Sequence, residues 1–157
     1  MSVNWDSVLA RLQSYPEHVH VTLPPCPYER IMAVEKQLGA LPDSTRDMLG
    51  HFNGAELFNR TGPLVTMFGI SLVPALPAFE WAPDWYIDKF TEIWRSGRNE
   101  GDDWALAMMN YGGVVLLDAT GTTKEWDSAT KMWSPERKSL DEWIEDIFRE
   151  GDAFLRD

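Results

Sequence analysis

The chain has 157 residues, of which 44% are hydrophobic and 25% are charged, a composition typical of a folded globular protein. Its formal net charge of −11 disfavours nucleic-acid binding, which needs a basic surface to contact phosphates. The apolar runs fall far short of the roughly 20 residues that a membrane span requires. We therefore expect one domain, residues 1–157, with neither a nucleic-acid nor a membrane partner.

The location of the protein is predicted from its first residues and its single cysteine. The N-terminus has neither the basic start nor the apolar stretch of a secretory signal. Cys26 is the only cysteine in the sequence and cannot form an internal disulfide, in agreement with a reducing compartment. We expect a cytoplasmic protein.

The negative charge is concentrated in the second half of the chain. Residues 80–157 contain 18 of the 25 acidic residues and 9 of the 14 basic ones, a net charge of −9. Such a surface favours a basic protein partner, because opposite charge steers the encounter and biases the choice of partner. Solubility alone is the alternative explanation of the charge.

The first half of the chain predicts three helices. An amphipathic helix begins near Trp5 and ends before Pro16, because apolar residues recur at helical spacing. A second helix is expected over residues 28–38, with Gly39 ending it. A short third helix follows Pro42 and is expected to end at the pair 53–54, Asn-Gly.

Strands and one helix are predicted for the middle of the chain. Residues 64–68 and 70–73 have the composition of strands, and residues 84–98 regain helical spacing, with Asp84 as the N-cap. Residues 104–109 and 114–117 are predicted to be central buried strands joined by a hairpin turn.

The last part of the chain predicts two exposed strands and a helix. Residues 122–127 and 131–133 alternate polar and apolar side chains, as strands with one exposed face do. Ser139 and Glu142 form a capping box that opens the final helix. Together the elements predict an α+β fold, a mainly antiparallel sheet flanked by about five helices.

One stretch of sequence resembles the signature of the SUKH superfamily. An apolar helix carries Glu35, then Leu38-Gly39 and Leu41-Pro42, and ten residues after Asp43 comes Asn53-Gly54. The helices of Trp5 and Trp143 and the strand pair around Gly112-Gly113 are also similar to that family. The residues that carry the resemblance are Trp5, Glu35, Leu38, Gly39, Leu41, Pro42, Asn53 and Gly54.

The resemblance implies a binding function without catalysis. SUKH proteins include bacterial immunity proteins that neutralise toxins, often nucleases, and a fungal branch that regulates cell-wall assembly through protein contacts. An immunity protein is the preferred interpretation, because carboxylates can occupy the basic cleft of a nuclease. A cytosolic scaffold or regulatory module of the cell-wall-assembly type is the alternative.

A candidate partner-binding site lies in the acidic half. It comprises the carboxylates and two tryptophans that follow: Asp88, Glu92, Glu100, Asp102, Asp103, Trp85 and Trp126. Tryptophans are enriched at binding hot spots. A solvated helix face and turn for the carboxylates, and core positions or carbohydrate stacking for tryptophans, are the alternatives.

Other residues carry weaker signals. His18 and His20 alternate in an apparent strand and suggest a shared metal, yet they match no known zinc spacing, so we expect a polar face and no metal or cofactor. Glu35 suggests either a buried acid with a raised pKa or, as we prefer, a structural hydrogen bond. Asp102, Asp103 and Asp118 lack the glycine loop that would cradle a phosphate beside magnesium.

Overall fold

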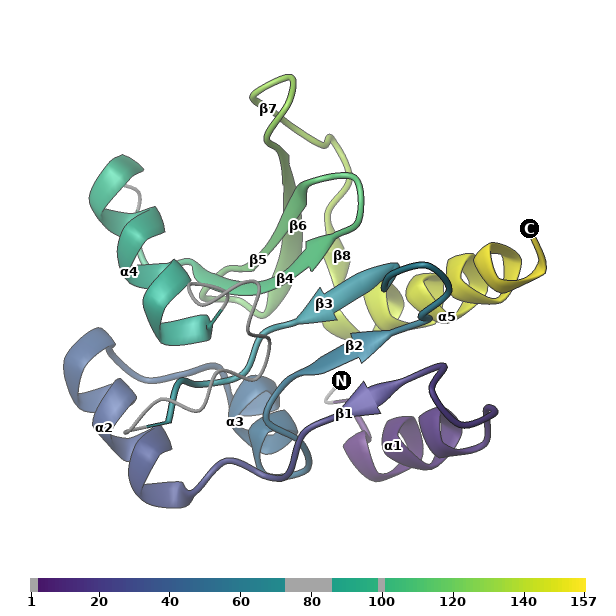
Figure 1. Ribbon diagram of the computed structural model, residues 1–157. Helices are drawn as coiled ribbons and strands as arrows, with labels where there is room; N and C mark the ends of the chain where they lie inside the picture. The colour runs from purple at the N-terminus through teal and green to yellow at the C-terminus, as the bar shows by residue number, and fades with distance from the viewer. Residues whose placement is uncertain (1–2, 73–85, 99–100) are drawn as a thin grey trace.

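The computed structural model of the chain describes residues 3–72, 86–98 and 101–157. In these ranges five helices accompany one antiparallel sheet, an α+β fold as the sequence predicts (Figure 1). The helices are α1 (Trp5–Gln13), α2 (Tyr28–Leu38), α3 (Asp43–Leu49), α4 (Ile87–Arg98) and α5 (Leu140–Arg156). The strands are β1 (Val21–Thr22), β2 (Ala55–Leu57), β3 (Val65–Met67), β4 (Trp104–Met109), β5 (Gly113–Leu117), β6 (Thr122–Asp127), β7 (Met132–Trp133) and β8 (Lys138–Ser139).

The sheet is a meander in which each strand pairs with the next one along the chain, from β1 to β7. The short strand β8 also pairs with β6, at Thr122 and Thr123, whereas β7 pairs with the other end of β6. Strands β4, β5 and β6 form its most extensive pairs. Strand β6 is therefore the last long strand of the sheet, and the short strands β7 and β8 each pair beside one of its ends.

The two faces of the sheet bury different sets of side chains. Along β5, Val115 and Leu117 point into the main core, whereas Val114 and Leu116 point to the opposite face. Successive strand residues alternate between faces, so this division follows from the pleat. Helix α4 covers the second face, and α5 lies on the other side of the same strands in Figure 1.

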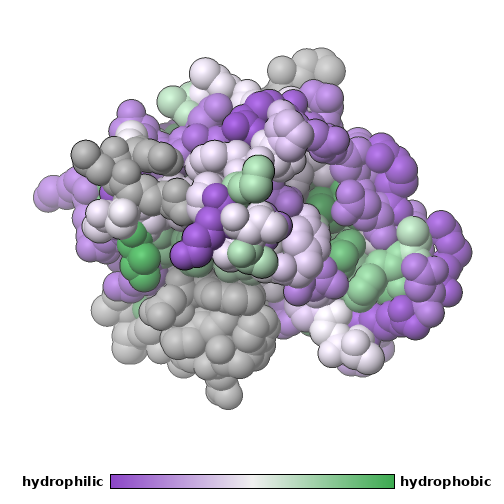
Figure 2. Space-filling model, turned by 90° about the horizontal axis from the view of Figure 1, so that it is seen from above, coloured by the Kyte–Doolittle hydropathy of each residue, from purple (hydrophilic) through white to green (hydrophobic). Residues whose placement is uncertain are grey.

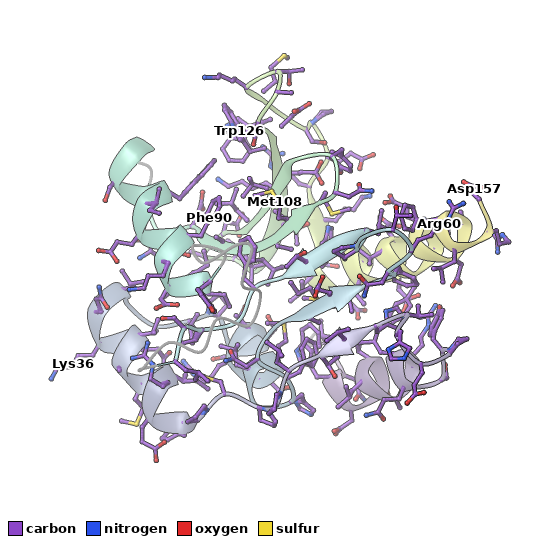
Figure 3. All side chains as sticks on the ribbon, in the orientation of Figure 1. Lys36, Arg60, Phe90, Met108, Trp126 and Asp157 are labelled. Atoms are coloured by element: carbon purple, nitrogen blue, oxygen red, sulfur yellow. The ribbon has the colours of Figure 1, made fainter. Side chains whose placement is uncertain are left out.

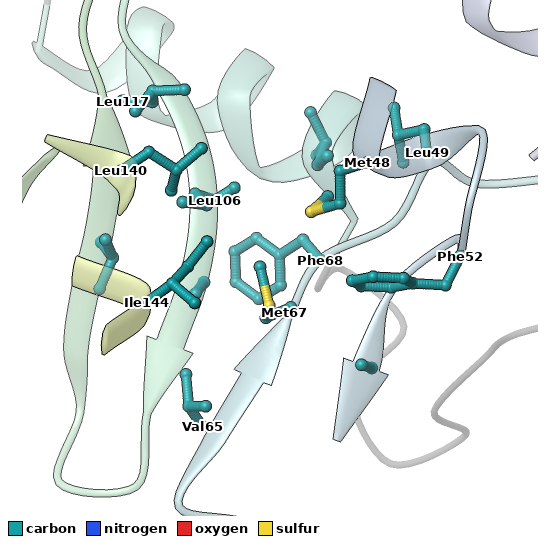
Figure 4. Close-up of a cluster of buried hydrophobic side chains, with 14 of the residues drawn as sticks. Met48, Leu49, Phe52, Val65, Met67, Phe68, Leu106, Leu117, Leu140 and Ile144 are labelled. Carbon is teal, nitrogen blue, oxygen red and sulfur yellow. The ribbon is translucent and has the colours of Figure 1, made fainter. Parts of the chain in front are cut away.

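The main core lies between the sheet and the helices α1, α3 and α5. Helix α3 contributes Met48 and Leu49, α5 contributes Leu140 and Ile144, and Phe68 lies between them (Figure 4). These side chains are at most 5% exposed. Helix α1 joins this core, where the indole N–H of Trp5 donates to the carbonyl of Ser44 at 2.8 Å.

The capping predictions succeed for the last helix. The Ser139 hydroxyl accepts the Glu142 N–H at 3.2 Å, and the Glu142 carboxylate accepts the Ser139 N–H in return. Helices α2 and α3 begin directly after Pro27 and Pro42, and Gly39 ends α2 with φ of 103°. The N-cap predicted at Asp84 lies outside the described residues.

Two element predictions are wrong. Helix α3 ends at Leu49 rather than at Asn53-Gly54. Residues 70–72 form no strand, because the Asn53 side chain takes both backbone groups of Ile70 and Asp88 accepts the N–H of Ser71. A backbone whose polar groups are satisfied by side chains has none left for a strand ladder. Position 73 lies outside the described residues.

Among the described helices, none has both the length and the apolar character that a bilayer crossing needs.

Candidate functional site: an acidic cleft between the last helix and the sheet

Two of the five carboxylates predicted as a partner-binding surface are buried and paired. Asp88 is 6% exposed; its carboxylate accepts the N–H and hydroxyl of Ser71 and lies 3.7 Å from Arg30. Asp103 is 7% exposed and pairs with Lys124 at 2.7 Å. Both are structural, because a buried, neutralised carboxylate cannot meet a partner.

The other five members of that predicted surface are in different settings. Glu92 and Asp102 are exposed, and Glu100 and Trp85 lie outside the described residues. Trp126 packs with Trp94 and Trp133, with ring centroids 5.1 to 6.1 Å apart. Figure 3 shows Trp126 on the same side of the sheet as Met108 and as Phe90 of α4. The half-buried Trp126 thus helps to hold α4 on the sheet, and the α4 face keeps two exposed carboxylates of the predicted set.

Glu35 has the structural role preferred for it. Its carboxylate accepts the Leu41 N–H at 2.9 Å and pairs with Arg46 at 2.6 Å. The hydrogen bond from Arg46 is the largest cause that lowers the Glu35 pKa, so the alternative of a raised pKa is wrong. The turn Leu38–Pro42 is thereby held against the start of α3.

The Asn-Gly pair is also structural. A Cβ on Gly54 would lie 2.9 Å from the Gly69 nitrogen, and one on Gly69 would lie 2.2 Å from the Asn53 carbonyl oxygen. The two segments therefore cross in direct backbone contact, which only glycine permits. Asn53 fastens the crossing through its two hydrogen bonds to Ile70.

The opposite face of the sheet carries a polar cleft that the sequence did not predict. It lies between α5 and the strands β5, β6 and β8, and its volume is about 130 Å³. The floor is apolar and consists of Met109, Val115, Trp143 and Ile147. The charged lining residues are Lys124, Glu125, Glu136, Lys138, Asp146 and Glu150. The Lys124 ammonium points to the opposite face, where it lies over the Trp133 ring and pairs with Asp103, so four carboxylates and the Lys138 ammonium leave the lining with a net negative charge.

Some of these charges neutralise each other. Lys138 pairs with Asp146 and, at 3.0 Å, with Glu136, and Arg149 adds a second cation to Asp146 at 2.7 Å. These hydrogen bonds raise the pKa of Lys138 and lower that of Asp146. Lys124 is engaged by Asp103. The cations of the cleft are therefore already committed to other groups.

Glu125 and Glu150 are left without such a partner. Neither forms an ion pair with any residue that the structure describes. Burial raises the pKa of Glu125 and the nearby charges of Glu150 and Asp127 raise it further, while a hydrogen bond from Tyr111 and the charge of Lys138 lower it. A cation placed beside Glu125 would favour its charged form.

Gly113 makes room for the group that orients Glu125. The Tyr111 hydroxyl donates to Glu125 Oε2 at 2.7 Å. A Cβ at position 113 would lie 2.7 Å from Tyr111 Cε2 and 2.9 Å from that carboxylate oxygen. The second oxygen, Oε1, accepts no hydrogen bond within the described part of the chain.

Trp143 lines the cleft and is 7% exposed. Its indole N–H has no acceptor among the residues that the structure describes. The nitrogen is not fully buried, so solvent can reach it. A buried indole N–H usually finds a partner. The cleft thus has an open donor as well as open acceptors.

Two larger hollows also lie among the described residues, one of about 450 Å³ lined in part by Arg95 and Asp102, and one of about 430 Å³ lined in part by Met108 and Ser128. No three His, Cys, Asp or Glu side chains within residues 3–72, 86–98 and 101–157 lie close enough to hold a metal ion. His18 is exposed, whereas His20 is half-buried against Tyr15 and Phe58. On the face shown in Figure 2, hydrophilic residues interrupt the apolar ones. A broad apolar docking surface is absent from that view.

The signal for the cleft was present in the sequence but split between two segments. Trp143, Asp146, Ile147 and Glu150 follow i, i+3, i+4, i+7 spacing, so one stripe of α5 mixes apolar side chains with carboxylates. Glu125 alternates with Trp126 in β6 and must face the opposite side. Only the tertiary packing of α5 on β6 brings these residues together.

No protein-family model matches the chain, and a search of curated proteins finds no match.

Proposed function

We propose that this chain is a non-catalytic protein-binding domain that captures a basic protein partner in the acidic cleft. The observation that carries the proposal is Glu125, a half-buried carboxylate with a raised pKa and no ion pair within the described residues. A cation supplied by a partner would stabilise its charged form. The net charge of −11 adds long-range attraction for the same partner.

The size of the cleft favours a side chain of a macromolecule as its occupant. Pockets for drug-sized ligands and cofactors measure roughly 300–1,000 Å³. At about 130 Å³, this cleft is smaller than that range. A protein partner would insert one residue here and spread its other contacts over the surrounding surface.

Three of the four carboxylates considered for catalysis or metal binding are engaged elsewhere, which supports a binding role. Glu35 and Asp103 hold ion pairs with Arg46 and Lys124. Asp118 accepts the N–H groups of Thr120 and Thr122 and thereby closes the β5–β6 turn. These hydrogen bonds lower its pKa against the opposing effect of burial.

Within this class, the function that we propose is that of an immunity protein of the SUKH type, acting in the cytoplasm. The Leu-Gly, Leu-Pro and Asn-Gly resemblance supports the family, and the negative cleft suits a toxin with a basic active site. Such a protein would act by occlusion, since it would cover the cleft in which a nuclease binds phosphate.

The test compares two double variants that remove the same charge from opposite faces of the sheet. Glu125→Gln with Glu150→Gln alters the cleft, and Glu92→Gln with Asp102→Asn alters the α4 face. Each protein serves as bait for secreted and cytosolic proteins of its source. A captured basic protein is then co-expressed in a bacterial host with each of the three versions, and host growth is measured.

We expect the wild type and the α4-face variant to capture the same basic protein in a 1:1 complex and to rescue growth, and the cleft variant to do neither. A basic partner that is bound without being inhibited would refute the immunity function. Equal capture by both variants would refute the cleft as the binding site. Capture of no basic protein at low salt would refute the proposal as a whole.

A further inference from the structure

We infer that the cleft is an arginine-anchor site, in which Glu125 and Glu150 receive the guanidinium of one arginine side chain and Trp143 donates to a carbonyl oxygen beside it. The inference rests on the proposed function and adds the chemistry of the partner residue. Three features of the cleft carry it: its open acceptors, its apolar floor and its open donor.

The open acceptors fit a guanidinium. Tyr111 occupies Oε2 of Glu125 at 2.7 Å and leaves Oε1 free, and Glu150 has no ion pair within the described ranges. Arginine carries five N–H donors in a planar fork and can bridge two carboxylates, whereas lysine presents a compact, strongly hydrated charge. An arginine also stays charged at every physiological pH.

The floor fits the stem of the same side chain. Met109, Val115 and Ile147 present apolar atoms between the charged walls. The three methylenes of arginine can lie on such a floor while the guanidinium remains among the carboxylates. A volume of about 130 Å³ accommodates one side chain rather than a peptide.

The open donor indicates that main chain enters with the side chain. Trp143 is 7% exposed and lines the cleft, and its N–H has no acceptor among the described residues. Solvent reaches this donor, and a carbonyl oxygen from the partner can replace water as its acceptor. Cation and carbonyl occur together in an arginine residue within a peptide.

The first probe is N-acetyl-arginine N-methylamide, which contains the side chain and one peptide carbonyl on each side. Its controls are the norleucine analogue, which has the stem without the charge, and the lysine analogue. The protein is labelled with ¹⁵N at its tryptophan indoles, and the Trp143 resonance is assigned with Trp143→Phe. Each probe is titrated into the wild type, Glu125→Gln, Glu150→Gln and the matched control Glu92→Gln.

We expect the arginine probe to move the Trp143 indole resonance saturably, with at least about tenfold weaker binding to Glu125→Gln and unchanged binding to Glu92→Gln. The norleucine probe should leave the resonance in place. An arginine probe that moves no Trp143 signal, or that binds Glu125→Gln as well as the wild type, would overturn the anchor site. A lysine probe that binds equally well would overturn the preference for arginine.

These outcomes are separable from those of the proposed function. If a basic protein partner depends on Glu125 and Glu150 but the arginine probe does not bind, the anchor is wrong and the function stands. If the probe binds but no basic protein is captured, the anchor stands and the proposed function is wrong.

Discussion

Each face of the sheet holds both paired and unpaired carboxylates, and their positions along the chain do not tell them apart. On the α4 face, Asp88 and Asp103 are buried and paired with Arg30 and Lys124. On the α5 face, Glu125 and its neighbour Glu150 have no ion pair among the described residues and surround a cleft. Charge density along the chain therefore does not locate a binding site, because tertiary pairing decides which charges remain available.

The largest expected effect tests whether the α4-face carboxylates are structural. Asp88→Ala leaves Arg30 without its carboxylate and removes two hydrogen-bond acceptors from Ser71. Breaking one side of a buried pair is expected to lower the free energy of unfolding by about 3 kcal/mol. Urea denaturation measures the change. The matched control is Glu92→Ala on the same helix, which should stay within about 0.5 kcal/mol of the wild type.

A loss in both variants, or in neither, would remove the distinction between paired and exposed carboxylates on that face.

The second effect concerns His20, which lies near α5 and must stay neutral. Its Nδ1 accepts the Phe58 N–H at 3.1 Å, and burial lowers its pKa to about 4, against a raising effect of Asp152. The unfolded chain therefore binds the proton more tightly, and stability is lost as pH falls from 6.5 to 4. We expect a loss of about 2 kcal/mol after allowance for partial solvent screening.

The measurement is chemical denaturation of the wild type and His20→Asn at pH 7, 6, 5 and 4. The amide oxygen of asparagine can replace Nδ1 as the acceptor without titrating. The wild-type minus variant difference also cancels His51, whose raised pKa acts in the opposite direction, since its stabilising effect is present at low pH and lost as pH rises. Parallel curves for the two proteins would contradict the prediction.

A third effect tests how the cleft is built. Gly113→Ala places a methyl group within 3 Å of both Tyr111 and Glu125 and should separate them. We expect about tenfold weaker binding of the basic partner, equivalent to about 1.4 kcal/mol. The control is Gly62→Ala, where a Cβ would meet nothing within 4 Å. Calorimetric titration of both variants compares them, and equal affinities would show that the contact between Tyr111 and Glu125 does not matter for binding.

The smallest effect is a mutation that we expect to leave stability unchanged or to increase it, whereas most mutations decrease stability. Because burial and like charges raise the pKa of Glu125, its charged form is disfavoured in the folded protein. Glu125→Gln should therefore keep or increase stability at pH 7, by up to about 0.5 kcal/mol, while it weakens partner binding. Thermal unfolding of Glu125→Gln and of the matched control Glu92→Gln measures the change in stability. A clear destabilisation would mean that Glu125 serves the fold.

The sequence predicted elements whose signals are local. The Ser139–Glu142 capping box and the strand over residues 104–109 appear as expected, since neighbouring residues determine them. The strand predicted at 70–73 fails over its described part because Asn53 and Asp88, each 17 residues from its partner, take the backbone groups. The end of α3 was misplaced for a related reason, because Asn53 serves that contact rather than a helix cap.

The sequence places the predicted site in the acidic half of the chain, on the α4 face, whereas the cleft that we propose lies on the α5 face. Asp88 pairs with a residue from α2, and Asp103 pairs across two strands, so their neutralisation cannot be read from nearby sequence. Glu125 was overlooked because its importance arises from α5 packing beside it. Ion pairs between residues far apart in the sequence, rather than the composition of each segment, decide which carboxylates on the two faces remain unpaired.

The most direct test of this account measures the affinity of the captured basic partner for the two isocharged double variants by calorimetry at one salt concentration. The account predicts that Glu125→Gln with Glu150→Gln weakens binding by about 100-fold or more, whereas Glu92→Gln with Asp102→Asn changes it by less than about threefold. Equal losses would mean that only net charge matters. A larger loss in the α4-face variant would place the site on the other side of the sheet.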